Sequence, residues 1–281
     1  MRFTTYLRDG QPRLAVVDGD TAIDLAADLR AELEDGTDLI AAARAALASG
    51  ARRLPLAGLR FAPLVPEPGK IICLGLNYFD HAKEGGREKP EYPWFFFRGA
   101  TSLVAHGAPG ILPKVSGKFD YEAELALVIG RRVPRHVSQD DAPEYVFGYT
   151  CFNDMSVRDY QKRTPQWTIG KNFDATGGFG PVLVSADELA PGATGLRIRS
   201  RLNGQVMQDA NTSDMIFSVA ETIALLAQCM TLDPGDAIIM GTPAGVGQAR
   251  TPPVWMKSGD TIEIVIEQIG VLRNPIVAEG A

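Results

Sequence analysis

The alternation of hydrophobic and polar residues predicts a chain built mostly of β-strands. In TIEIVIEQI, Ile262, Ile264 and Ile266 alternate with Glu263 and other residues, as in a strand with one buried face. The stretch ELALVI, residues 124–129, is almost continuously apolar and is expected to enter a core. Further strands are predicted at FTTYL, RLAVV, IICLGL, WFFF, YVFGYT, PVLVS, LRIRSRLN and AIIM. Asp-Gly pairs after FTTYL and RLAVV predict tight hairpin turns.

Helical patterns are fewer. The alanine-rich sequence from about Leu25 to Leu47 predicts a helical segment that is interrupted near Asp35 and Gly36. DHAKEGG predicts a single helical turn ended by glycines, and SVAETIALLAQCM a second substantial helix. MSVRDYQKR is also expected to be helical, with Asp154 as its N-cap.

A cluster of Pro63, Pro66, Pro68 and Gly69 marks the best domain boundary. We therefore expect a small N-terminal domain over residues 1–66 and a larger domain over residues 67–281. Many short strands with Gly and Pro turns favour a closed or sandwich-like β architecture over a doubly wound parallel sheet.

Composition narrows the classes of partner. The 281 residues carry a formal net charge of -6, which gives no reason to expect nucleic acid or an anionic membrane surface. Three dispersed cysteines, Cys73, Cys151 and Cys229, indicate neither a disulfide framework nor a structural zinc site. The N-terminal stretch does not resemble a signal peptide, and no apolar run approaches the roughly 18 residues of a membrane span. We expect a cytoplasmic protein.

Acidic residues stand at the head of the apolar run 124–129. Asp120, Glu122 and Glu124 are spaced two apart, so in a strand they would face the same side, roughly 6.6 Å from one to the next. Asp154 adds a further carboxylate downstream. Glu122, Glu124 and Asp154, with no histidine or cysteine, favour a hard cation, Mg²⁺ first, with Mn²⁺ and Ca²⁺ as alternatives. The competing interpretation is a solvated sheet face.

His81 and Glu84 form a second candidate site. They are three residues apart on the predicted helical turn and can therefore form a hydrogen bond. A carboxylate behind an imidazole fixes its tautomer and raises its basicity, as a general base requires. Gly85 and Gly86 could let the turn move as a lid. The alternative is an ordinary surface pair.

Two cations could offset the charge of an anionic substrate beside the carboxylates. Lys171 lies in IGKNFDATGGFGP, and Arg158 lies four residues after Asp154. Arg158 could instead simply pair with Asp154, and Lys171 could be an ordinary ion-pair partner. Gln161 could share the helical face of Arg158.

Glycines surround Thr242 in GDAIIMGTPAGVG. The backbone N–H groups of such a loop could cradle an anion. Its spacing is neither that of a Walker A loop nor G-x-G-x-x-G. The alternative is a tight turn after a strand.

Seven stretches, taken in order, resemble the fumarylacetoacetate hydrolase family and cover most of residues 70–275. They are KIICLGLNYFDHAKEGG, DYEAELALVIG, GYTCFNDMSVRDYQ, GKNFDATGGFGP, LNGQVMQDANTSDMIF, LDPGDAIIMGTPAGVG and GDTIEIVIEQIGVLRNPI. The resemblance implies a mixed, β-rich α+β fold, with a β-roll catalytic domain behind a small N-terminal α+β domain. It also implies a homodimer with Mg²⁺ held by Glu122, Glu124 and Asp154.

Roles for the other candidates follow from the same resemblance. His81 and Glu84 match a histidine–glutamate pair on a mobile lid, and Lys171 matches a catalytic lysine. Lys171 and Gln161 would stabilise developing negative charge or orient water. Thr242 lies in a loop beside the substrate in similar proteins.

One stretch departs from the family pattern. Many relatives carry Lys-Pro where this chain has Arg98 and Gly99, which puts substrate contacts at that point in doubt.

The family resemblance implies a small 2-oxo acid substrate but leaves the reaction open. His81 and Glu84 favour hydrolysis of a carbon–carbon bond in acylpyruvates or related 2,4-diketo acids, because a general base can activate water. Isomerisation or decarboxylation of 2-hydroxy-diene-dioates and decarboxylation of oxaloacetate are the alternatives. A non-catalytic carboxylate-binding protein would keep the metal but would need no base.

Overall fold

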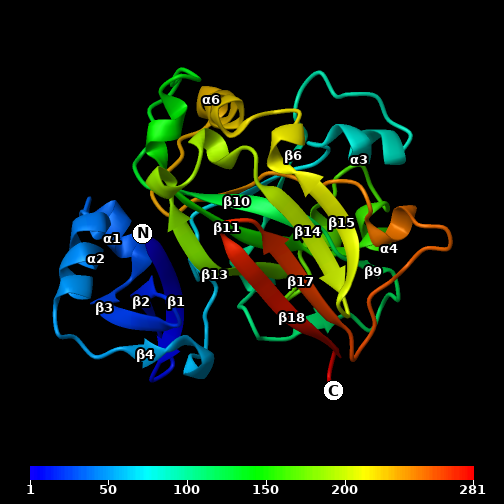
Figure 1. Ribbon diagram of the computed structural model, residues 1–281. Helices are drawn as coiled ribbons and strands as arrows, with labels where there is room; N and C mark the ends of the chain where they lie inside the picture. The colour runs from blue at the N-terminus through cyan, green and yellow to red at the C-terminus, as the bar shows by residue number, and fades with distance from the viewer.

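The structure, a computed structural model, describes residues 1–281 and is a β-rich α+β protein (Figure 1). Its strands form an eleven-stranded sheet, a five-stranded sheet and a two-stranded ribbon. Helices are few and short, and none is long and apolar enough to cross a membrane. The mixed, β-rich α+β fold that the family resemblance implies is therefore confirmed, as is the predominance of strands that the hydrophobic pattern predicts.

The large sheet runs in the order β4-β3-β2-β1-β13-β11-β10-β16-β5-β6, with β7 beside β13. Most neighbours are antiparallel; β16 with β5 and β13 with β7 are parallel. The strands are β1 Arg2–Arg8, β2 Gln11–Asp18, β3 Thr21–Ala27, β4 Leu54–Pro55, β5 Ile71–Leu74, β6 Phe95–Arg98, β7 Leu103–Val104, β10 Ala123–Ile129, β11 Val146–Asp154, β13 Gly177–Ser185 and β16 Ala237–Ile239.

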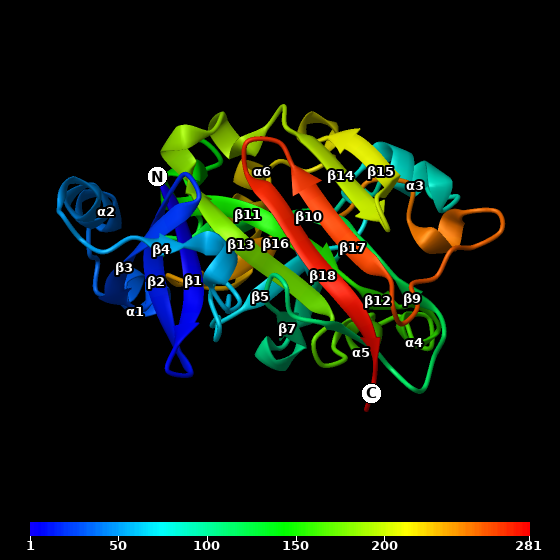
Figure 2. The same ribbon diagram turned by 60° about the horizontal axis from the view of Figure 1, so that its bottom comes forward.

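The five-stranded sheet, order β15-β14-β17-β18-β8, lies beside the large one (Figure 2). Its strands are β8 Gly110–Leu112, β14 Arg197–Leu202, β15 Gln205–Asn211, β17 Thr261–Ile266 and β18 Gly270–Ala278. The small ribbon pairs β9 Phe119–Asp120 with β12 Ser156–Val157. Ile262, Ile264 and Ile266 of β17 are buried, as their alternation predicted.

The position of strand β10 between two hydrophobic cores explains its apolar sequence. Leu125 and Leu127 belong to the core that includes the isoleucines of β17, whereas Ala126 and Val128 belong to the core on the opposite face. Because both faces of β10 are covered, every residue from Ala123 to Ile129 is buried. This central strand is the rigid support on which Glu124 stands.

The helices lie at the periphery of the sheets (Figure 1). They are α1 Leu29–Glu34, α2 Leu39–Ala48, α3 Phe79–Glu84, α4 Arg158–Gln161, α5 Thr168–Lys171 and α6 Val219–Cys229. Asp28, Asp38 and Ser218 cap α1, α2 and α6 by accepting backbone N–H bonds. The predicted break near Asp35 is confirmed. The first helix begins only at Leu29, because the residues before it extend β3.

The N-terminal strands continue the main sheet. β1 pairs with β13 in a register that places Phe3 opposite Leu183. Hairpin turns join β1 to β2 and β2 to β3, as the two Asp-Gly pairs predicted. The division at residues 1–66 and 67–281 stays a prediction, since hydrogen bonds join the two parts.

The helix expected over MSVRDYQKR is much shorter than predicted. Asp154 ends strand β11 instead of capping a helix, and α4 begins only at Arg158, with Val157 as its N-cap. Ser156 and Val157 pair with β9, so this segment is extended. Tertiary pairing has therefore overridden the local preference for helix.

Candidate active site

Glu122, Glu124 and Asp154 converge as predicted. Ligand oxygens of the three carboxylates all lie within 4.8 Å of one another, and all three residues are buried. β10 and β11 are antiparallel neighbours, with Glu124 opposite Phe152 and Ala123 opposite Asn153. This register brings the start of β10 to the end of β11. The alternative of a solvated sheet face is wrong.

The three carboxylates fit one hard divalent cation. Two oxygens on opposite sides of a Mg²⁺ or Ca²⁺ ion lie about 4–5 Å apart, which matches the spread of these ligand atoms. The donor set is all oxygen, and burial of like charges is unfavourable unless a cation compensates them. Burial, with the charges of Asp154 and Glu122, raises the pKa of Glu124 well above its ordinary value.

Asp120 does not join this cluster. Its carboxylate accepts hydrogen bonds from Arg158 Nε at 2.8 Å, from the backbone N–H of Gly247 at 2.7 Å and from that of Gln248 at 3.0 Å. Asp120 is therefore not one of the candidate metal ligands, although Arg158 connects it to Glu122. β9 ends at Asp120 and β10 begins at Ala123, so strand alternation does not hold across the intervening residues.

Lys171 is bound directly to the carboxylate cluster. Its Nζ lies 2.5 Å from Glu122 Oε2 and 2.5 Å from Asp154 Oδ2, and the side chain is buried. Burial by itself would lower the pKa of Lys171, but Asp154 and Glu122 outweigh it and raise that pKa. Lys171 is therefore a fixed positive charge in the centre.

Arg158 pairs with Asp120 and Glu122 and not with Asp154. Its Nη2 lies 2.7 Å from Glu122 Oε1, an ion pair whose angle is not that of a hydrogen bond. Residues 154 and 158 do not share a helix, so the predicted four-residue pairing cannot form. Gln161 Oε1 accepts a hydrogen bond from Arg158 Nη1 at 3.0 Å, which confirms that the two share a face of α4.

Arg98 is a member of the centre that the sequence reasoning missed. Its guanidinium is fully buried, pairs with Asp154 and donates to Ser102 Oγ at 3.2 Å and Thr176 Oγ1 at 2.8 Å. The sequence did contain an indication of its role. Arg98 ends an apolar strand, at the point where this chain departs from the family pattern. Arg98 therefore contacts a metal-ligand carboxylate, and its own donors are taken up by protein groups.

His81 and Glu84 lie on α3 and form the predicted pair. His81 Nδ1 lies 3.2 Å from Glu84 Oε2, and the side chains are only 14% and 21% exposed. Glu84 Oε1 also accepts the backbone N–H of Gly245 at 2.9 Å. With Nδ1 directed at Glu84, Nε2 is the nitrogen left to exchange a proton with a bound molecule. This is not an ordinary surface pair.

A cavity of about 340 Å³, which we call the carboxylate pocket, brings these groups together. Its wall includes His81, Glu84, Glu122, Glu124, Arg158, Gln161, Lys171 and Thr242. Leu74, Phe96 and Trp167 give it an apolar side. Gly75 makes room for this wall, because a Cβ there would lie 2.5 Å from the Trp167 ring.

The glycine loop after β16 binds carboxylates of the protein itself. Gly241 N–H donates to Glu124 Oε2 at 2.7 Å, while Gly245 holds Glu84 and Gly247 holds Asp120. The predicted anion cradle is thus confirmed, but its anions are side chains of this chain. Thr242 Oγ1 donates to the Ala123 carbonyl at 2.9 Å and accepts from Gln208.

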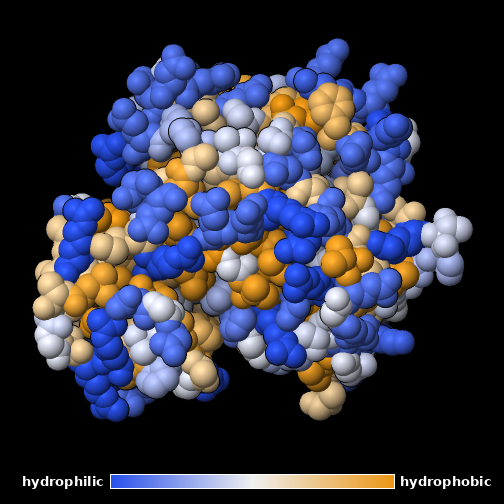
Figure 3. Space-filling model, viewed as in Figure 1, coloured by the Kyte–Doolittle hydropathy of each residue, from blue (hydrophilic) through white to orange (hydrophobic).

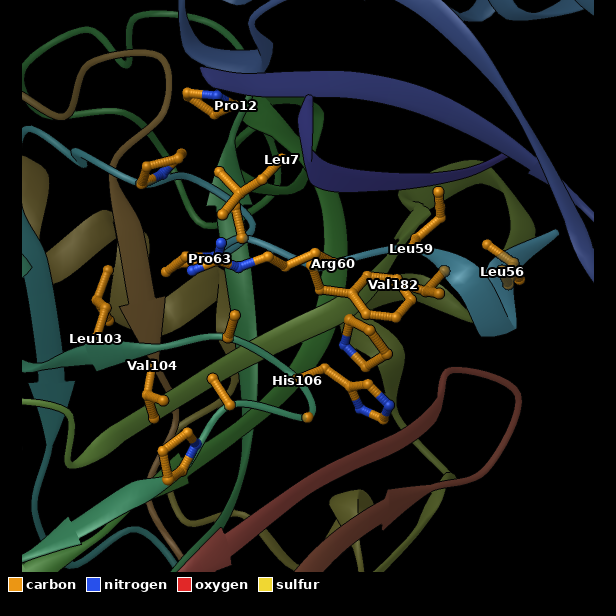
Figure 4. Close-up of a pocket in the computed structure, with 18 of the residues that line it drawn as sticks. Leu7, Pro12, Leu56, Leu59, Arg60, Pro63, Leu103, Val104, His106 and Val182 are labelled. Carbon is orange, nitrogen blue, oxygen red and sulfur yellow. The ribbon is translucent and has the colours of Figure 1, made fainter. Parts of the chain in front are cut away.

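A larger cavity lies elsewhere, where residues 56–63 face β7 and β13 (Figure 4). It measures about 1120 Å³ and is mostly apolar, with Arg60 and His106 as its only ionisable side chains. It contains no carboxylate. Chemistry and not size therefore identifies the carboxylate pocket as the candidate active site.

Comparison with known proteins agrees with this geometry. Residues 70–277 match the family model "Fumarylacetoacetate (FAA) hydrolase C-terminal". The chain is 41% identical over 247 residues to human mitochondrial oxaloacetate tautomerase FAHD2A, covering 87% of this chain and 78% of that protein.

Two solved structures extend the likeness over the whole chain. Maleylpyruvate hydrolase from Sphingobium sp. SYK-6, in complex with manganese(II) and pyruvate, gives a TM-score of 0.83 at 33% identity and 99% coverage of both chains. The 2-hydroxyhepta-2,4-diene-1,7-dioate isomerase from Mycobacterium marinum gives 0.80 at 32% identity, with the whole of both chains covered. The chain therefore belongs to the fumarylacetoacetate hydrolase family.

Proposed function

We propose that the protein is a divalent-metal-dependent tautomerase that interconverts the enol and keto forms of a small 2-oxo acid. One observation carries the proposal: His81, paired with Glu84, lines the same 340 Å³ pocket as Glu122 and Glu124. A proton-transfer group and a hard-cation site thus face one small substrate space. The likeness to an oxaloacetate tautomerase at 41% identity supports this reaction over the others.

Glu122, Glu124 and Asp154 would hold the cation, which supplies a Lewis acid that polarises the 2-oxo group. Enol-to-keto conversion requires one proton to leave the enol oxygen and one to arrive at the neighbouring carbon. His81 Nε2 is the group placed to accept the proton from the enol oxygen and to deliver a proton to the carbon, because Nδ1 is directed at Glu84. Glu84 would stabilise the imidazolium form while His81 holds the proton.

The cations of the pocket would orient the substrate. Arg158 and Gln161 are hydrogen-bonded to each other and line the pocket beside the carboxylates. Two of the three donors of Lys171 are used by Glu122 and Asp154, so its main part is to keep those carboxylates ionised and in place. Thr242 would shape the wall, since its hydroxyl already bonds to Ala123 and Gln208.

A second candidate function is hydrolysis of a carbon–carbon bond in acylpyruvates or other 2,4-diketo acids. The same His81–Glu84 pair could remove a proton from water instead of from substrate. The likeness to a maleylpyruvate hydrolase at 33% identity favours this reading. Isomerisation or decarboxylation of 2-hydroxy-diene-dioates would use His81 as the proton carrier, as the likeness to a dienedioate isomerase suggests.

The test follows the decay of enol oxaloacetate by its ultraviolet absorbance, with Mg²⁺ or with a chelator. We expect acceleration that requires Mg²⁺ and falls roughly 10²–10⁴-fold in His81→Gln. His136→Asn is the matched control, because His136 is exposed and lies outside the pocket. Pyruvate release from acylpyruvate without tautomerisation would establish the hydrolase instead. Full Mg²⁺ binding with no acceleration of either reaction would refute both.

A further inference from the structure

Two cations at the carboxylate pocket have no ion-pair partner. Arg87 and Lys162 both line the pocket, and neither has a carboxylate oxygen within 4.0 Å. The other pocket cations differ, because Arg158 and Lys171 are each bound to two carboxylates. Exposed lysines and arginines often lack partners, but these two face a substrate cavity in a protein of net charge -6.

Arg87 is held in place by an aromatic contact that does not use its hydrogen-bond donors. Its guanidinium lies over the Trp94 ring at 4.8 Å, and Trp94 packs edge-on against Trp167 at 5.5 Å. Trp167 packs in turn against Phe96 at 5.9 Å, and both line the pocket. This cation–π contact uses none of the N–H groups of Arg87 in a hydrogen bond, so they remain available to a carboxylate.

Lys162 stands among like charges. Burial and the charges of Arg158, Lys118 and, to a smaller extent, Arg87 lower its pKa, with Asp120 acting in the opposite direction. Such crowding of cations is unfavourable in the free protein. An anion bound between Arg87 and Lys162 would relieve it.

The charged lining of the pocket has an excess of cations. Three carboxylates, Glu84, Glu122 and Glu124, stand against four cations, Arg87, Arg158, Lys162 and Lys171. A divalent cation bound at the carboxylates would add two positive charges. The pocket therefore attracts a dianion more strongly than a monoanion.

We propose that Arg87 and Lys162 form a subsite for a second carboxylate at the end of the substrate away from the 2-oxo group, and that these two residues set the selectivity for dicarboxylates over monocarboxylates. This inference rests on the proposed function, because it takes the 2-oxo end to lie at Glu122, Glu124 and Asp154. It assigns selectivity to two residues that take no part in proton transfer.

A matched pair of ligands isolates the subsite. Oxaloacetate and 2-oxobutanoate share the 2-oxo acid end, and only oxaloacetate carries a distal carboxylate. Calorimetric titration of the Mg²⁺-loaded protein gives the Kd of each without requiring turnover. Arg87→Gln and Lys162→Gln remove one charge each from the subsite.

The controls remove the same charge nearby. Lys89 lies over the Phe79 ring at 5.5 Å and Arg163 over the Tyr160 ring at 3.6 Å, and neither lines the pocket. Lys89→Gln and Arg163→Gln therefore report any general change in electrostatic field. Thermal melts of all four variants report any change in folding.

We expect Arg87→Gln and Lys162→Gln each to weaken oxaloacetate binding roughly tenfold, with 2-oxobutanoate binding unchanged. The control variants should match wild type with both ligands. Equal weakening of both ligands, equal effects in the controls, or no effect at all would overturn the inference. Normal discrimination by a protein that fails to tautomerise oxaloacetate would keep the subsite and refute the proposed function.

Discussion

The buried guanidinium of Arg98 is ion-paired with Asp154, at the end of strand β11. The same carboxylate also accepts from Lys171, so two cations hold one metal ligand. Ser102 and Thr176 take further donors of Arg98 and fix its orientation. Arg98 therefore supports the metal-ligand carboxylate of Asp154 from the protein interior.

This pair predicts a metal-dependent loss of stability. Arg98→Met leaves Asp154 with Lys171 alone, and breaking a buried ion pair costs about 3–5 kcal/mol. Denaturant unfolding should show a loss toward the lower end of that range without metal, because Lys171 remains. Saturating Mg²⁺ should reduce the loss, since it supplies positive charge. Arg98→Lys should lose less, and a loss independent of Mg²⁺ would contradict this account.

Removing one carboxylate should abolish metal binding while keeping the fold. Glu124→Ala deletes a ligand whose other partner is the Gly241 N–H, so the loop loses one contact and the sheet none. Calorimetry should show Mg²⁺ affinity reduced beyond detection, together with loss of activity and a folded circular dichroism spectrum. Gln248→Ala, which removes a polar side chain that lines the same pocket and is not a proposed ligand, is the control and should retain binding. Unchanged Mg²⁺ affinity in Glu124→Ala would refute the site.

The two contacts of Glu84 can be separated. In Glu84→Gln, an amide oxygen can still accept from Gly245, but the charge that supports an imidazolium on His81 is gone. We expect a smaller fall in kcat than for His81→Gln, with KM and Mg²⁺ affinity nearly unchanged. Glu84→Ala should lose both contacts and fall further. Wild-type kcat in Glu84→Gln beside a large loss in Glu84→Ala would assign the residue to loop structure alone.

His106 should make the protein less stable in acid. Burial and the charge of Arg273 lower its pKa from the ordinary 6.5, while Glu263 acts weakly the other way. The folded state therefore favours the neutral ring. Its contribution to stability is present above about pH 6.5 and is lost as pH falls through the depressed folded value. The Tm of His106→Gln should fall less than that of wild type between pH 7.5 and pH 5.

We propose, as the family resemblance implies, that the chain forms a homodimer. Hydrophobic side chains gather across the middle of the face in Figure 3, and Val206 and Val271 of the five-stranded sheet are 44% and 40% exposed. Light scattering at micromolar concentration should give about twice the chain mass of 30.3 kDa. A monomer mass would refute the proposal.

Periodicity predicted most of the strands because each buries a regular set of side chains. It predicted the isoleucine face of β17 directly, and the apolar run of β10 indicated a core. The carboxylate cluster followed from spacing and from donor chemistry. The local sequence led to a wrong prediction at Asp154, because Ser156 and Val157 pair with β9 where a helix was expected.

Other features depend on contacts between distant residues. Arg98 and Asp154 are 56 positions apart, and no local pattern connects them. The split between Asp120, which binds Arg158, and Glu122, which joins the cluster, depends on where β9 ends. In the sequence, nothing distinguishes Arg87 and Lys162 from ordinary surface charges, and only the fold places both at one cavity.

The glycine loop has a consequence for how this protein can vary. Through three backbone N–H groups it aligns the proton carrier's partner Glu84, the metal ligand Glu124 and the structural acid Asp120. A Cβ at Gly247 would lie 2.0 Å from the Val254 carbonyl and 2.5 Å from Asp120, so even alanine would disturb the template. A substitution that displaced the whole loop would therefore disturb the partner of the base and a metal ligand together. A change of substrate is therefore easier at Arg87 and Lys162, which line the pocket and are not paired with its carboxylates.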